Sequence, residues 1–112
     1  MAPRDGLTEL EQLAMLSVLR LGQDAYAAAV RRDLVETAQR SLSAATVHVT
    51  LVRLERKGLL DSVESDPEPV RGGRSRRCFR TTREGAEALR RSREVMDRMW
   101  ARVDTHPALR GA

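Results

Sequence analysis

Residues 43–58, S-A-A-T-V-H-V-T-L-V-R-L-E-R-K-G, constrain the fold of this chain more than any other stretch. A serine at a helix start accepts hydrogen bonds from free backbone N–H groups, and a glycine after the last turn adopts the left-handed backbone that ends a helix. At 100° per residue, Ala44, Val47, Leu51 and Leu54 fall on one side. We therefore expect a helix that begins after Ser43, ends at Gly58 and buries one face.

The opposite face of this helix combines positive charge with short side chains. It carries Thr46, Val49, Thr50, Val52, Arg53, Arg56 and Lys57. Hydroxyls and methyl groups beside cations suit the DNA major groove, where phosphates flank base edges and thymine methyls. A half-buried helix with an ordinary polar face is the alternative that this stretch alone leaves open. The residues that we expect to contact DNA from this helix are Ser43, Thr46, His48, Val49, Thr50, Arg53 and Lys57.

Two amphipathic segments precede this helix. Thr8 and Glu11 have the spacing of a capping box, which predicts a helix over about 10–21. Its apolar residues surround most of its circumference, so we expect both its own domain and a second chain to cover it. Asp24 is the expected cap of the next helix, over about 25–39. A helix, a short connector and a basic-faced helix form a helix-turn-helix.

After Gly58 the apolar period changes from 3.6 residues to 2, which predicts a β-hairpin with strands at 59–64 and 75–81. The segment between the strands holds two prolines and two glycines, and residues 70–80 contain five arginines and no acid. A solvated, self-repelling loop is the alternative. We expect a wing that approaches the DNA backbone or minor groove. Its expected DNA contacts are Arg71, Gly72, Gly73, Arg74, Arg76 and Arg77.

The last segment, 82–104, has the pattern of a helix with a narrow apolar seam. Leu89, Ser92, Met96, Met99 and Val103 follow the 3-4-3-4 spacing of a coiled coil. About 22 residues form a rod of roughly 33 Å, longer than a domain of this size needs for its own core. We therefore expect a homodimer. The expected dimer interface consists of Leu10, Leu13, Leu89, Met96, Met99, Trp100 and Val103.

Trp100 and Met96 are also the candidate contacts of a small aromatic effector. Packing in the dimer core is the alternative role of Trp100, and it is the one that the apolar seam favours.

Composition restricts the remaining functions. With 112 residues the chain has the length of one domain, and its net charge of +4 favours an anionic partner. Cys78 is the only cysteine, and His48 and His106 lie on different predicted elements, so we expect no metal site, cofactor or catalytic centre. No apolar run has the roughly 20 residues of a membrane span, and the N-terminus lacks an apolar signal core. We expect a cytoplasmic protein that does not contact a membrane.

These elements predict a mainly α fold with a small β-hairpin (α+β), organised as a winged helix-turn-helix with a long C-terminal dimerisation helix. The expected boundaries are a disordered N-terminal lead at 1–6, the DNA-binding domain at 7–81, the dimerisation helix at 82–104 and a flexible tail at 105–112.

The order of these segments resembles the PadR family of bacterial transcriptional regulators, in its short type with one C-terminal helix. The similar segments are L-T-E-L-E-Q-L-A-M-L-S-V-L (7–19), D-A-Y-A-A-A-V (24–30), L-V-R-L-E-R-K-G-L-L (51–60), G-G-R-S-R-R (72–77) and T-x-x-G (82–85). The resemblance implies a homodimer that binds a palindromic operator, usually as a repressor. In members that sense small molecules, it implies a pocket near the terminal helices.

The chain departs from the family pattern at four positions. His48 stands where the family usually has a tyrosine that helps to hold the DNA backbone, and Ala27 replaces a usual glycine. Cys78 replaces an aromatic residue in the returning strand, and Thr81 replaces the leucine before T-x-x-G. These departures bear on DNA contacts and hairpin packing more than on the fold.

We expect a sequence-specific DNA-binding regulator: a homodimeric repressor that a small aromatic ligand could release. Two alternatives belong to other classes. One is a winged-helix protein-interaction module with an acidic partner, and the other is a general nucleoid protein without site preference. Positive charge on both the helix at 43–57 and the hairpin favours DNA, because a protein-binding winged helix has no need of both.

Overall fold

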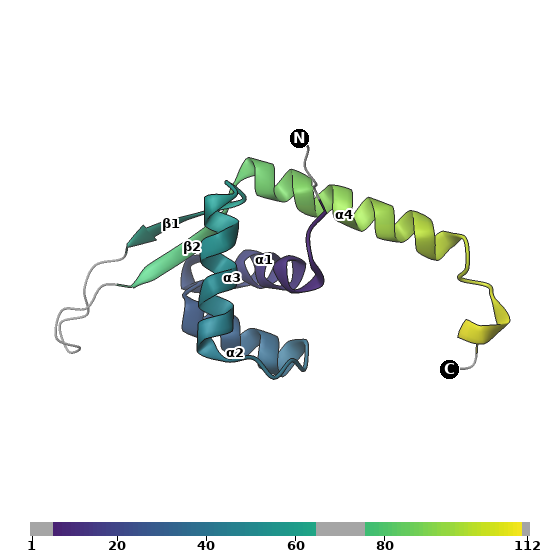
Figure 1. Ribbon diagram of the computed structural model, residues 1–112, viewed down its shortest axis with the longest axis horizontal. Coiled ribbons are helices and arrows are strands. Elements are labelled where there is room, and N and C mark those ends of the chain that lie inside the picture. Colours follow the sequence, from purple (N-terminus) through teal and green to yellow (C-terminus); the bar gives the residue numbers. More distant parts are fainter. Residues whose placement is uncertain (1–5, 65–75, 111–112) are drawn as a thin grey trace.

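The structure is a computed structural model that describes residues 6–64 and 76–110. Its elements, in chain order, are α1 (Glu9–Leu21), η1 (Gly22–Asp24), α2 (Ala27–Thr37), α3 (Ala44–Arg56), β1 (Leu60–Glu64), β2 (Arg77–Thr81), α4 (Arg83–Ala101) and η3 (Pro107–Leu109). The two strands pair antiparallel, with Leu60 opposite Thr81 and Glu64 opposite Arg77. The hairpin extends to one side of α1, α2 and α3, and α4 runs off to the other side (Figure 1). This arrangement confirms the predicted fold class.

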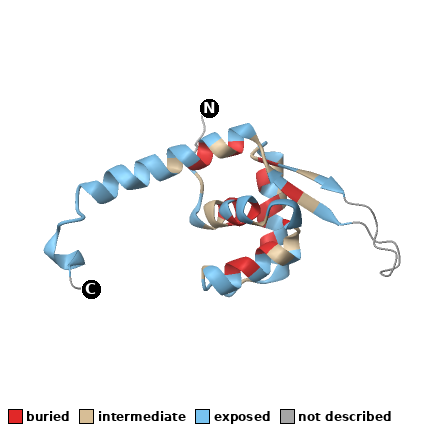
Figure 2. Ribbon diagram, turned by 180° about the vertical axis from the view of Figure 1, so that it is seen from behind, coloured by how far each residue is buried: buried red, intermediate tan, exposed pale blue. Residues whose placement is uncertain are grey.

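The core lies where α1, α2, α3 and the hairpin meet, and Figure 2 shows that α4 joins it only near its start. Leu51 and Phe79 are among the largest side chains that it buries completely. The other large side chains that are fully buried are Met15, Val18, Val30, Val47, Leu54, Leu60 and Glu11. Of the four residues expected on the buried face of α3, only Ala44 is exposed, because it lies in the first turn.

The helix starts follow from capping side chains, with one exception. The capping box of α1 is confirmed: the Glu11 N–H donates to the Thr8 hydroxyl at 3.0 Å, and the Thr8 N–H donates to the Glu11 carboxylate at 2.9 Å. Ser43 caps α3 as predicted, accepting from the Thr46 N–H at 3.0 Å. The expected cap of α2 is wrong. Asp24 belongs to η1, so α2 begins only after Tyr26, which makes no side-chain cap bond.

Two short stretches fix the direction in which α4 leaves the domain. Gly58 ends α3 in the left-handed conformation (φ +79°). The Thr82 hydroxyl donates to the Gly58 carbonyl at 2.7 Å, and the Thr82 N–H donates to the Leu59 carbonyl at 3.1 Å. Gly85 lies against the same carbonyl, since a Cβ atom there would be 2.1 Å from the Leu59 oxygen. We call these four residues the α3–α4 joint.

Beyond its first two turns, α4 carries mostly exposed side chains. The chain then turns, and η3 follows where the sequence predicted a flexible tail. His106 caps this turn, because its Nδ1 atom accepts from the Ala108 N–H at 3.0 Å.

Candidate nucleic-acid interface

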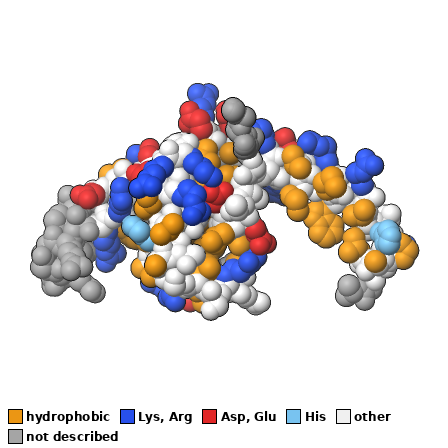
Figure 3. All heavy atoms as spheres, in the orientation of Figure 1, with side chains coloured by type: hydrophobic (Ala, Val, Ile, Leu, Met, Phe, Trp, Pro, Cys, Tyr) orange, Lys and Arg blue, Asp and Glu red, His pale blue; other side chains and the backbone are white. Residues whose placement is uncertain are grey.

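The outward face of α3 presents short side chains at its start and positive ones at its end. Thr46, His48, Val49 and Arg53 are all exposed, and Val49 has 52% of its surface accessible. Ser43 orders the first turn, because its hydroxyl donates to the Thr46 hydroxyl at 2.9 Å. Basic side chains gather over this region in Figure 3. These residues form the mixed polar and methyl-bearing surface that the sequence predicted.

Thr50 does not belong to this surface, and its expected outward position is wrong. Only 3% of its surface is exposed, and its hydroxyl donates to the Thr46 carbonyl at 2.8 Å. At 100° per residue, Thr50 lies about 40° from Leu54 and about 60° from Val47 around the helix axis. It therefore lies beside the edge of the apolar arc, and its burial shows that the core covers this edge as well.

Lys57 has a partner within the chain, although the sequence assigned it to DNA. Its Nζ atom lies 2.8 Å from the carboxylate of Glu11, a residue with 1% of its surface exposed. Burial opposes the ionisation of Glu11, but hydrogen bonds from Lys57 and Thr8 outweigh it and lower the pKa below its ordinary value of 4.5. The ion pair ties the end of α3 to the start of α1, so Lys57 helps to orient α3.

A second buried carboxylate fixes α1 to α2, and sequence reasoning missed it. Asp33 accepts from the Ser17 hydroxyl at 2.7 Å, from the Thr37 hydroxyl at 3.0 Å and from the Arg20 guanidinium. The hydrogen bond from Arg20 is the main reason that the pKa of Asp33 lies below its ordinary value of 3.8. The available signal was an acid beside Val30 and Leu34 on the buried stripe of α2.

The hairpin base is attached to α3 through a small polar cluster. Arg77 donates to the Ser62 hydroxyl at 3.1 Å and lies 3.3 Å from the carboxylate of Glu55. Ser62 in turn donates to the same carboxylate at 2.6 Å. This cluster sets the direction in which the hairpin leaves α3. The other predicted wing residues, Arg71, Gly72, Gly73 and Arg74, lie outside the described residues, whereas Arg76 is described and exposed.

The seam expected on α4 is largely unpacked in the single chain. Exposed hydrophobic side chains continue along this helix in Figure 3. On α4 they are Val95 (48% exposed), Met96 (51%), Met99 (59%) and Trp100 (52%), and Val103 (43%) follows in the turn after the helix, which ends at Ala101. Trp100 and Met96, the candidate ligand contacts, line a hollow of about 300 Å³ together with Met99, Val103 and Leu109 of η3. The predicted ligand residues therefore lie on the same surface as the predicted dimer seam.

The other predicted interface residues differ from this seam. Leu89 is only 9% exposed and packs in the core of its own chain, so it leaves little surface for a second copy. Leu10 and Leu13 are half-buried and pack against the same core. The apolar residues of α1 that are exposed are Leu16 and Leu19, each about half exposed, and the sequence analysis did not assign them to the interface.

The described residues contain no group of three or more histidine, cysteine, aspartate or glutamate side chains that could hold a metal ion. None of the helices in the described part of the chain is both long and apolar enough to span a bilayer.

Comparisons with known proteins agree with this architecture. The model of the transcriptional regulator PadR-like family matches residues 15–91. A PadR family regulator from Eggerthella lenta has a similar structure with 27% identity and a TM-score of 0.66, covering 93% of this chain and 88% of its own. A PadR family regulator from Clostridium difficile has 26% identity and a TM-score of 0.58, covering 83% and 91%.

A PadR-like transcription factor from Bacteroides fragilis, at 23% identity, shares the fold with a TM-score of 0.69 and covers 86% of this chain and 87% of its own. Among curated proteins, no sequence matches the chain.

Proposed function

The chain belongs to the PadR-like family of transcriptional regulators, and we propose that it acts as a homodimeric repressor of a palindromic operator. Each copy contributes one α3 to the major groove of one half-site and one hairpin beside it. A small aromatic ligand bound near Trp100 releases the DNA. Membership of a family of transcriptional regulators supports DNA as the partner, and the remaining details depend on the surfaces of this chain.

The exposed seam of α4 carries this proposal. Five apolar side chains, each between 43% and 59% exposed, follow one another along the distal part of α4 and into the turn after it. Such a continuous apolar surface marks an interaction site in soluble proteins. A second copy presents the same stripe, and two identical stripes pair around a twofold axis. The axis relates the two α3 helices, so the DNA half-sites must be inverted repeats.

The outward face of α3 supports sequence-specific reading. Arginine makes bidentate contacts with guanine, and threonine and valine methyl groups contact thymine methyls. Arg53, Thr46 and Val49 present these groups on one exposed face. A protein module with an acidic protein partner would need the positive charge but not the methyl-bearing turn before it.

The effector role follows from the position of Trp100 on the seam. A planar aromatic cation or phenol that stacks on this indole would enter between the two α4 helices. It would change how they pack and hence the separation of the two α3 helices. Ligand and operator would then weaken each other's binding by the same factor. Trp100 fluorescence reports on ligand entry directly, because this is the only tryptophan of the chain.

The decisive experiment combines a footprint on the DNA upstream of the protein's own gene with sedimentation of the free protein. We expect two protected half-sites about one helical turn, or ~34 Å, apart, and a dimer at micromolar concentration. Arg53→Ala should weaken operator binding by about 1–3 kcal/mol and relax preference at one base pair in each half-site. A monomer in solution, or equal affinity for all sequences, would contradict the proposal. The latter result would indicate general DNA binding.

A further inference from the structure

A hollow of about 570 Å³ lies between the end of α1, η1 and the hairpin. We call it the hairpin hollow. Val18 and Phe79, two fully buried residues of the core, contribute to its lining. Leu19 and Val63 also line it, and these two apolar side chains are 53% and 45% exposed. Pockets that bind small molecules have volumes of roughly 300–1,000 Å³ and mainly apolar walls, and the hairpin hollow has both properties.

The hairpin hollow is separate from the surfaces that we assign to DNA and to the effector. Among the described residues, none from α3 or α4 lines it. Val63 and Cys78 lie opposite each other in the hairpin, and side chains alternate between the two faces of a strand. They therefore occupy the face opposite to that of Ser62 and Arg77, which contact α3.

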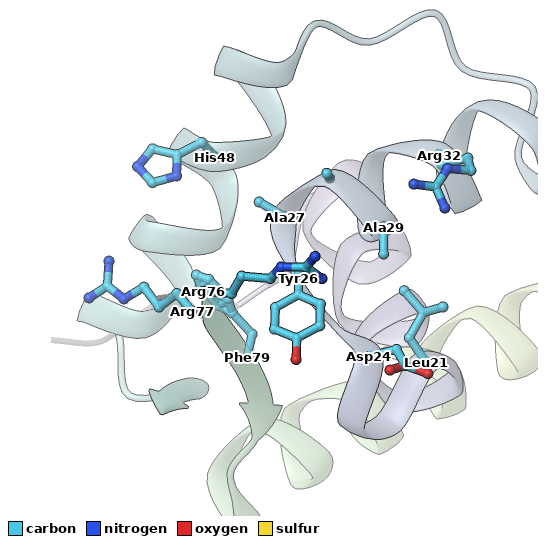
Figure 4. A pocket seen from close by; sticks show the side chains of 11 residues that line it. Leu21, Asp24, Tyr26, Ala27, Ala29, Arg32, His48, Arg76, Arg77 and Phe79 are labelled. Carbon is cyan, nitrogen blue, oxygen red and sulfur yellow. The ribbon is translucent and has the colours of Figure 1, made fainter. Parts of the chain in front are cut away.

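The charge of the lining distinguishes this hollow from its neighbour. Tyr26 and Phe79 also line a larger hollow of about 780 Å³ toward α2 and α3, whose side chains Figure 4 shows. The lining of that larger hollow is basic and includes Arg32, His48, Arg76, Arg77 and Asp24. In the hairpin hollow, Arg80 is the only charged residue among the described lining residues, and its Nε atom lies 3.0 Å from the Asp61 carboxylate. The hairpin hollow therefore suits an uncharged molecule.

Hydrogen bonds hold the walls of the hairpin hollow in place. The Phe79 N–H donates to the Ala25 carbonyl at 2.9 Å, and the Cys78 thiol donates to the Gln23 carbonyl at 3.3 Å. These bonds join β2 to the segment between α1 and α2. Because the walls are already fixed, a molecule that enters the hollow needs to order few groups of the protein.

One polar group of the hairpin hollow has no partner in the free chain. Thr81 lines the hollow, and its hydroxyl is the only buried side-chain oxygen or nitrogen atom of the described residues without a hydrogen-bond partner. An unpaired buried hydroxyl is unfavourable, so a bound molecule that supplies the missing partner gains affinity. A threonine side chain has other staggered rotamers, so the hydroxyl can turn toward such a molecule without a shift of the strand.

We propose that the hairpin hollow binds an uncharged, mainly apolar small molecule that carries one hydroxyl group. The apolar walls contact its hydrocarbon part, and the Thr81 hydroxyl forms a hydrogen bond with its hydroxyl. Cys78 and Thr81 are two of the four positions at which the chain departs from the family pattern, so this lining is a feature of the chain itself. The site goes beyond the proposed function and does not depend on it, because binding is measured without DNA.

The test uses naphthol, an uncharged two-ring phenol, and follows the alkylation of Cys78 by iodoacetate with mass spectrometry. Cys78 is the only cysteine of the chain and lines the hollow, so its alkylation reports on this site alone. We expect saturating naphthol to slow the alkylation about tenfold, because a molecule in such a pocket covers the thiol. Naphthol that quenches Trp100 fluorescence without slowing the alkylation would be bound on the seam of α4, and the proposal would be overturned.

A pair of valine variants locates the bound molecule. Val63→Glu places a charge in the apolar wall, and we expect the naphthol concentration for half-protection of Cys78 to rise about tenfold or more. Val35→Glu is the matched control, because Val35 is an exposed valine of α2 outside the hollow, and it should leave that concentration unchanged. Thermal unfolding checks that both variants are folded. Wild-type protection in folded Val63→Glu would contradict the site.

Thr81→Val tests the proposed hydrogen bond, because it removes the hydroxyl and keeps the shape of the side chain. The variant should be at least as stable as the wild type, since the hydroxyl loses no partner, yet it should bind naphthol about fivefold more weakly. The methyl ether of naphthol lacks the O–H donor and should bind the two proteins equally well. Equal naphthol affinity in the wild type and Thr81→Val would overturn the role of Thr81.

Discussion

The helices α3 and α4 both have amphipathic sequences, but in the folded chain α3 exposes its polar side and the distal part of α4 exposes its apolar side. The apolar side of α3 is covered by its own domain, and what remains exposed is polar, positive or short. The distal half of α4 exposes its apolar side, and the described residues leave it largely uncovered. An apolar stripe therefore predicts that a helix will be covered, but it does not say whether the same chain provides the cover.

The largest effect that we expect concerns the uncovered helix. Replacing both Met96 and Met99 with aspartate would place two charges in the proposed seam, where unpaired charge is expensive to bury. We expect the dissociation constant of the dimer to rise at least about a thousandfold, or ~4 kcal/mol, so that sedimentation shows a monomer at micromolar concentration. Unfolding of the dilute monomer should be almost unchanged. If the variant remains dimeric, the interface lies elsewhere.

Truncating one apolar residue on each helix should distinguish the covered helix α3 from the uncovered helix α4. Leu51 of α3 is fully buried, and Leu51→Ala should lower the free energy of unfolding by about 2–5 kcal/mol. Met99 of α4 is 59% exposed, so Met99→Ala should cost the monomer less than about 0.5 kcal/mol. Urea unfolding at a protein concentration below dimer formation measures both. Similar losses in the two variants would show that the distal part of α4 is already packed in one chain.

At Gly85, in the α3–α4 joint, the fold should tolerate no side chain. In Gly85→Ala the new methyl group would meet the Leu59 carbonyl, and we expect a loss of about 1–3 kcal/mol. Gly6→Ala is the control, because a Cβ atom at Gly6 has nothing within 4 Å. Thermal unfolding compares the two. A Gly85→Ala protein as stable as the control would mean that α4 can shift away from the joint without cost.

The smallest effect that we expect is a loss of stability in acid. Low pH should weaken the bonds of Asp33 and Glu11, which hold α1, α2 and α3 together, before it affects the seam of α4. Asp33 and Glu11 have lowered pKa values in the folded chain, so their stabilisation is complete above the ordinary values of 3.8 and 4.5. It is lost as the pH falls below those values and through the folded ones. Asp33→Asn should be less stable near neutral pH and lose less stability on acidification. Asp97→Asn, on exposed α4, should follow the wild-type curve.

Local signals predicted much of this molecule. Thr8 with Glu11, Ser43, Gly58 and Thr82 mark helix ends through bonds to their immediate neighbours, so their positions could be inferred from spacing alone. The start of α2 could not, because the extra turn of η1 at Asp24 has no such signal. Its end was also misplaced, since Gln39 adopts a left-handed backbone that side-chain patterns do not record.

The sequence predicted the exposure of a candidate site residue only where the position of that residue around its helix determines it. Thr46, Val49 and Arg53 were placed correctly, but Thr50 lies at the edge of the buried arc, where a helical projection cannot settle its exposure. The bond between Lys57 and Glu11 joins residues 46 positions apart and depends on the tertiary fold.

The α3–α4 joint has a consequence for how operators of this type can diverge. Because the joint contains no flexible linker, α4 would act in the proposed dimer as a fixed arm whose length sets the distance between the two α3 helices. Inserting seven residues before the seam would lengthen each arm by about 10 Å. The half-sites could then separate by up to roughly 20 Å, or about six base pairs. Spacing between half-sites can therefore evolve in α4 while the residues that read each half-site stay unchanged.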